Sequence, residues 1–69
     1  MSEGGGHLAY QERVIVERSE LEVKFLALGI FIAGSKFNEL PPRQRDLLLM
    51  QHGHMKAYLK ILNERIAEF

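Results

Sequence analysis

Two histidines near the centre of the second half of this 69-residue chain, His52 and His54, are the first candidates for chemistry. Their imidazoles are the kind of side chain that ligates metal ions. On a helix, however, residues two apart point about 200° away from each other, so the pair cannot chelate one ion from a continuous helix. We therefore expect surface or interface histidines here and no metal site.

Tyr10, Arg13 and Lys24 combine an aromatic ring with two cations. In a nucleotide site, such a ring stacks on a base and such a cation pairs with a phosphate. Tyr10 and Lys24 lie within about 40° of each other on one helix face but about 21 Å apart along the axis. One chain therefore cannot grip a small ligand with both, whereas two antiparallel copies could. The alternative is a solvated charge stripe with an interface tyrosine.

Arg65 is a further candidate cation, near the end of the chain. Its alternative roles are to complement the dipole of a helix C-terminus or to pair with Glu68. No catalytic set accompanies these residues, because no serine lies in a nucleophile elbow and the segment Gly4 to Gly6 is not followed by the Lys-Ser/Thr of a phosphate-binding loop. We expect a binding protein, with no enzyme activity and no cofactor.

Apolar periodicity defines the elements that must position these side chains. Residues spaced by 7, 4 and 3 mark one seam on each of two helices. The seam residues are Val14, Leu21, Phe25, Leu28 and Ile32, then Leu48, Met55, Leu59, Leu62, Ile66 and Phe69. The pattern predicts an all-α, antiparallel two-helix hairpin: a flexible leader over 1–7, then a single domain over 8–69 with a helix over 8–34, a turn over 35–41 and a helix over 42–68.

The predicted turn contains residues that favour it. Gly34 can adopt the left-handed conformation that ends many helices, and Pro41-Pro42 suits the start of the next one. Phe37 and Leu40 are the expected apolar anchors under the tip of the hairpin.

Apolar residues outside the two seams predict self-association. A hairpin buries one stripe per helix, yet each helix carries a second set, which includes Ile15, Leu26 and Ile61. A chain this short is marginal as a monomer, and the absence of Cys excludes disulfides. Further copies of the chain are the simplest cover for the second set, so we expect a homo-oligomer.

Charge and hydropathy exclude several partners. Nine basic and nine acidic residues give a formal net charge of zero, which argues against DNA or RNA polymers. The longest apolar run, over 25–33, is too short to span a membrane. The polar, Gly-rich start lacks the apolar segment of a secretory signal. We expect a cytoplasmic protein.

An ordered set of segments resembles a known family and covers nearly the whole chain after His7. The set is 10–21 (YQERVIVERSEL), Lys24, Phe31-Ile32, Phe37-x-x-Leu40-Pro41 and Met55-x-x-Tyr58-x-x-Ile61-Leu62-x-x-Arg65-Ile66. It resembles the anti-CBASS sponges, small phage proteins that inhibit cyclic-oligonucleotide-based antiphage signalling. Members bind the host's cyclic dinucleotides, and in many cases cyclic trinucleotides, without cutting them.

The resemblance implies a helical hairpin assembled as a compact hexamer, a homo-oligomer with its ligand sites between protomers. It implies that Tyr10 stacks on a base and Lys24 contacts a phosphate of a cyclic dinucleotide; we place Arg13 in the same site. It also implies that Arg65 serves a separate cyclic-trinucleotide site where three protomers meet, since three guanidiniums match three phosphates in charge.

The residues alone leave two rival functions open. A self-associating structural or adaptor module would bind a protein helix in its apolar stripe, and then Ile15, Leu26 or Ile61 would matter more than Lys24. A small DNA-binding regulator would need a basic recognition helix and excess positive charge, both of which this neutral chain lacks.

Overall fold

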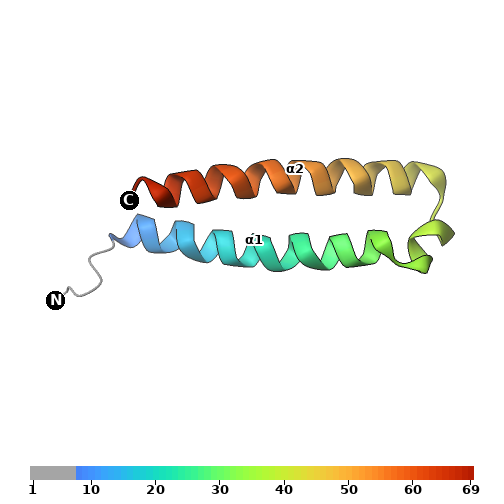
Figure 1. Ribbon diagram of the computed structural model, residues 1–69, viewed down its shortest axis with the longest axis horizontal. Coiled ribbons are helices and arrows are strands. Elements are labelled where there is room, and N and C mark those ends of the chain that lie inside the picture. The colour runs from blue at the N-terminus through green and yellow to red at the C-terminus, as the bar shows by residue number, and fades with distance from the viewer. Residues whose placement is uncertain (1–7) are drawn as a thin grey trace.

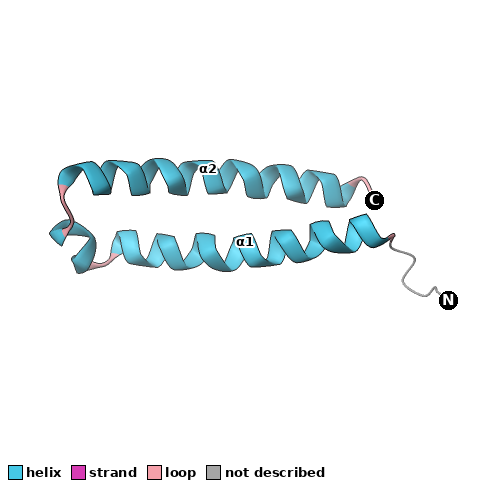
Figure 2. Cartoon of the chain, turned by 180° about the vertical axis from the view of Figure 1, so that it is seen from behind, coloured by secondary structure: helices cyan, strands magenta, loops and turns pink. Residues whose placement is uncertain are grey.

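The computed structural model describes residues 8–69 and shows two long helices lying side by side (Figure 1). Helix α1 spans Ala9–Ala33, helix α2 spans Pro42–Ala67, and a short 3-10 helix, η1, covers Ser35–Glu39 between them. Figure 2 shows the same hairpin from behind, with helices and loops and no strand in the described part. The predicted all-α hairpin is confirmed, whereas the leader expected over 1–7 lies outside the described residues.

Local hydrogen bonds explain where α1 begins and ends. The backbone N–H of Leu8 donates to Oε1 of Gln11 at 2.8 Å, so Gln11 reaches back across the first turn. At the other end the N–H of Gly34 donates to the carbonyl of Phe31 at 3.1 Å. Gly34 has φ −87° and ψ 167°, so α1 ends in extended backbone and the expected left-handed conformation is wrong.

The tip of the hairpin is held by apolar contacts. The rings of Phe31 and Phe37 meet edge to face, with centroids 6.4 Å apart and an interplanar angle of 85°. Phe37 and Leu40 are both half-buried, which confirms them as the anchors of the turn. Helix α2 then starts at Pro42, where the missing N–H costs no hydrogen bond.

The seam between the helices contains the few buried side chains of the described residues. Val14, Leu59 and Leu62 are exposed by only 5%, 9% and 1%. The other predicted seam residues are half-buried, except Phe69, which is 38% exposed because it follows the end of α2. The predicted seam is therefore confirmed up to its last position.

The predicted seam skips one turn on each helix, between Val14 and Leu21 and between Leu48 and Met55. Two polar residues, Arg18 and His52, fill these two turns of the seam. The His52 ring stacks on Phe25, with centroids 4.4 Å apart and planes at 12°. A Cβ at Gly29 would meet Nε2 of His52 at 3.3 Å, so this glycine leaves room for the imidazole. Nη1 of Arg18 donates to Oδ1 of Asn63 at 3.1 Å. His52, expected at a surface or an interface, lies half-buried in the seam between the two helices.

The hairpin is long and thin, 53 × 16 × 14 Å, with a radius of gyration of 16.0 Å. A compact domain of this length has about 11 Å. The accessible surface is 5170 Å², against about 4400 Å² for a compact monomer of this mass. A single hairpin thus leaves much of its apolar surface in water. None of the described helices combines the length and the apolar character needed to cross a membrane.

Replacing Leu62 by Ala should be the most costly truncation in the seam. Leu62 is 1% exposed, so its removal forfeits burial and leaves a cavity, about 2–5 kcal/mol of unfolding free energy. The control Leu49→Ala removes a side chain that is 50% exposed and should cost at most about 1 kcal/mol. Denaturant unfolding at one protein concentration measures both, and equal losses would show that Leu62 is not central to the seam.

Candidate functional site

Tyr10 lies in the first turn of α1 and is 46% exposed. Its ring meets that of Phe69 edge to face, with centroids 5.8 Å apart and an interplanar angle of 81°. Nε2 of Gln11 donates weakly to its hydroxyl, at 3.4 Å. The C-terminus of the chain therefore orients the ring while much of its surface stays open to a ligand.

Arg13 and Lys24 both lie on α1 with exposed side chains. Neither forms an ion pair or a side-chain hydrogen bond with any residue in the range 8–69. Because α1 runs unbroken between Tyr10 and Lys24, the two stay about 21 Å apart along the axis. The structure therefore keeps Tyr10 and Lys24 apart within one chain. This separation is the one that their spacing in the sequence predicts.

Two contacts set the register at the open end of the hairpin: Tyr10 lies against Phe69, and Arg18 bonds to Asn63. The helices are antiparallel, and Arg65 comes between Asn63 and Phe69 in the chain. Arg65 must therefore lie beside the first third of α1. The structure thus brings this arginine to the same end of the hairpin as Tyr10.

Helical phase then places the candidate residues on one side. The hydrogen bond between Arg18 and Asn63 marks one flank of the seam. On α1, the side chains of Tyr10 and Lys24 point about 80° and 120° away from Arg18 round the helix. On α2, those of Tyr58 and Arg65 point about 140° and 160° away from Asn63, towards the same opposite flank. This flank, the Tyr–cation side, carries two aromatic rings and two cations: Tyr10, Lys24, Tyr58 and Arg65.

Tyr58 is the member of this side that the sequence analysis did not assign. It is 42% exposed and precedes Arg65 by two helical turns. The 7-residue spacing between Tyr58 and Arg65 already places both on one face of α2 and was the available signal. The side as a whole offers stacking surfaces and positive charge, which suits anions that carry bases or other rings.

The described residues offer little for other chemistry. No group of three or more His, Asp or Glu side chains within 8–69 is placed to hold a metal ion. His54 is exposed on α2 while His52 lies in the seam, so the continuous helix separates the two imidazoles.

Comparisons with known proteins place the chain in a family. Residues 8–68 match the model of a protein family described as Sequestin. The chain is also similar to an uncharacterized 7.5 kDa protein of the denB-rIIB intergenic region of Enterobacteria phage T4. The two are 42% identical over 62 residues, which cover 90% of this chain and 97% of that protein. No solved structure matches the chain significantly.

The contact between Tyr10 and Phe69 predicts different effects for two substitutions. Tyr10→Phe keeps the ring and loses only a weak, exposed hydrogen bond, so the melting temperature should stay within about 2 °C. Tyr10→Ala loses the edge-to-face contact, about 0.5–1.5 kcal/mol, and should melt several degrees lower. Thermal unfolding by circular dichroism measures both, and equal melting temperatures would show that the ring contact does not order this end.

Proposed function

The chain belongs to the Sequestin family, the phage sequestering proteins that its sequence resembles, and we propose that it binds host cyclic dinucleotides and holds them without cleaving them. Binding is the whole mechanism. A protein with several tight sites lowers the free concentration of the signal below the level that the host's antiphage effector needs, in the cytoplasm of the infected cell.

The observation that carries this proposal is the placement of Tyr10 and Lys24. Both are accessible on one face of a straight helix, yet they are too far apart to hold one small ligand together. An antiparallel pair of α1 helices from two copies brings the ring of one copy near the ammonium of the other. The ring stacks on a base, the ammonium pairs with a phosphate, and Arg13 adds a second cation. A two-fold symmetric ligand suits such a two-fold interface.

Arg65 supports a second type of site. Its guanidinium is exposed near the C-terminus of α2, on the Tyr–cation side. Where three copies meet, three guanidiniums can face the three phosphates of a cyclic trinucleotide. Both types of site require several copies, in line with a compact homo-hexamer.

An adaptor module that binds a protein helix is the second candidate function. Thirteen large apolar side chains in the described part of the chain are exposed, which favours some further macromolecular contact. Calorimetry separates the two functions, because an adaptor gives no heat with cyclic nucleotides and depends on apolar residues such as Leu26 more than on Lys24.

Substitution of the dinucleotide site should weaken binding without dissociating the protein. Tyr10→Ala removes base stacking, worth about 1–3 kcal/mol per base, which is roughly a 5- to 150-fold rise in Kd. Lys24→Ala should weaken binding at least as much, while Tyr10→Phe should bind like the wild type. Isothermal calorimetry with a panel of cyclic dinucleotides measures these changes, and sedimentation checks the assembly. Wild-type affinity in both Ala variants would refute the site, and a cleaved ligand would refute sequestration.

Arg65→Ala should separate the two ligand classes. Loss of the guanidinium removes all phosphate pairing from a three-copy site, so cyclic trinucleotide binding should fall by tenfold or more, since charged hydrogen bonds contribute about 1.5–3 kcal/mol each. Cyclic dinucleotide affinity should stay within about threefold of the wild type. The same calorimetric panel tests this, and a parallel loss of both ligands would mean that Arg65 belongs to one shared site.

A further inference from the structure

Helix α1 carries an exposed apolar ridge on its back, made of Val16, Val23, Leu26 and Ile30. These side chains are 54%, 69%, 57% and 74% exposed, respectively. The ridge residues lie about 125–175° round the helix from the seam and about 80–160° from the directions of Lys24 and Tyr10. Neither the partner helix nor a ligand at the proposed dinucleotide site can cover it. A stripe of this kind on a small protein marks an interaction surface.

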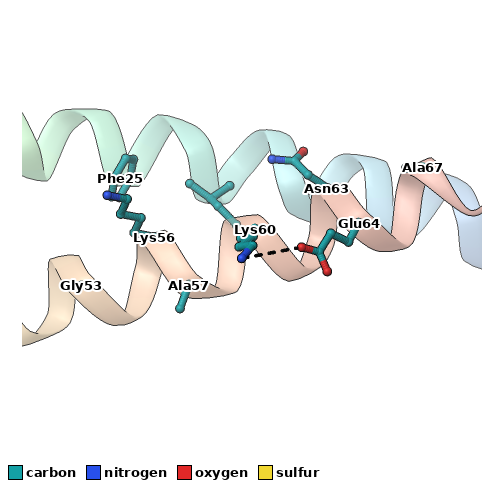
Figure 3. A pocket seen from close by; sticks show the side chains of 9 residues that line it. Phe25, Gly53, Lys56, Ala57, Lys60, Asn63, Glu64 and Ala67 are labelled. Atoms are coloured by element: carbon teal, nitrogen blue, oxygen red, sulfur yellow. Dashed lines mark ion pairs between the residues drawn. The ribbon is translucent and has the colours of Figure 1, made fainter.

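A groove of about 730 Å³ runs along α2, lined by the residues that Figure 3 labels. Because Asn63 is among them, the groove lies on the flank opposite the Tyr–cation side. Phe25 and Leu59 contribute to its apolar lining, together with the short side chains of Gly53, Ala57 and Ala67. A Cβ at Gly53 would meet nothing within 4 Å, so the space above this residue is open. Short side chains let the backbone of a second helix approach closely.

The ridge and the groove match in length. The ridge extends from Val16 to Ile30, and the lining of α2 extends from Gly53 to Ala67. Each interval is 14 residues of continuous helix, about 21 Å. A helix that presents the ridge would therefore fill the groove from end to end.

Charges on the two surfaces are complementary. Glu20 and Glu22 lie beside the middle of the ridge. The groove, in contrast, is lined by two bases, Lys56 and Lys60, and one acid, Glu64, so that its lining keeps one net positive charge. Lys60 reaches Glu64 only at 4.0 Å in an exposed pair (Figure 3), which contributes little stability. Lys56 has no ion pair with any residue of the described part. The ammonium of Lys56 is therefore free to face the carboxylates of an incoming α1, and that of Lys60 can exchange its weak pair with Glu64 for one of them.

We propose that the ridge of α1 in one copy seats in the groove of α2 in a second copy. This contact is heterologous, since each copy offers a different surface to each neighbour, and repeated contacts of this kind form rings where the rotation between copies closes. The proposal rests on the self-association that the proposed function requires. It assigns assembly to the back of α1 and leaves the Tyr–cation side free for ligand sites.

Two charge insertions test the contact, one on each surface. Val23→Glu places a carboxylate on the ridge, and Ala57→Glu places one in the groove, facing Glu20 and Glu22 of the neighbour. Both positions are exposed within one chain, so neither carboxylate disturbs the hairpin's own seam, and any loss of helix content by circular dichroism should follow the loss of mass on dilution. Sedimentation velocity should show a lower mass for each variant than for the wild type. Asn38→Glu, an equal charge change on the exposed tip, should keep the wild-type mass.

A mixture of the two variants makes the test specific to a ridge-in-groove contact. The intact ridge of the Ala57→Glu chain can enter the intact groove of the Val23→Glu chain, so the mixture should regain mass that neither variant shows alone. Wild-type mass for either variant alone, a mixture no heavier than its components, or a monomeric wild type would overturn the inference. Calorimetry with cyclic dinucleotide on the same samples is independent: wild-type protein that gives no heat overturns the proposed function, while the ridge-in-groove contact still stands or falls on sedimentation.

Discussion

The structure depends on a single seam between two helices. Only Val14, Leu59 and Leu62 are buried among the described residues, while thirteen large apolar side chains remain exposed. Burial of apolar surface is the main force that offsets the entropy lost on folding, and one narrow seam supplies little of it. In the assembly that we propose, further copies supply the missing burial, and the proposed ligand sites form between those copies.

Polar residues inside the seam determine which surfaces face outward. His52 stacks on Phe25, and Arg18 donates a hydrogen bond to Asn63. Both contacts require one axial register and one rotation of each helix about its axis. Polar groups with specific partners at a helix–helix seam favour one arrangement over its slipped alternatives, the role best known from coiled coils. In this register, Tyr58 and Arg65 share a side with Tyr10 and Lys24, and the apolar groove opens on the other side.

Apolar periodicity and turn residues in the sequence were sufficient to predict the hairpin, the seam and the apolar anchors Phe37 and Leu40. Side chains buried along a helix–helix seam recur at spacings of 7, 4 and 3 residues, and this pattern is visible in the sequence itself. The apolar pattern did not identify His52 and Arg18 as seam residues. Both are polar, and their place in the seam depends on partners in the other helix, which periodicity within one helix does not reveal. The distance between Tyr10 and Lys24 followed from helix geometry alone. The placement of Tyr58 and Arg65 beside α1 did not, because it depends on the register between two helices. The residue roles rest on the family resemblance and remain proposals.

The central claim is that the hairpin is stable only when further copies cover its exposed apolar surface. Sedimentation equilibrium and circular dichroism across a dilution series test it most directly. The account predicts that helix content falls as the assembly dissociates and that the melting temperature rises with protein concentration. A fully helical monomer at low concentration, with a melting temperature that does not depend on concentration, would contradict it.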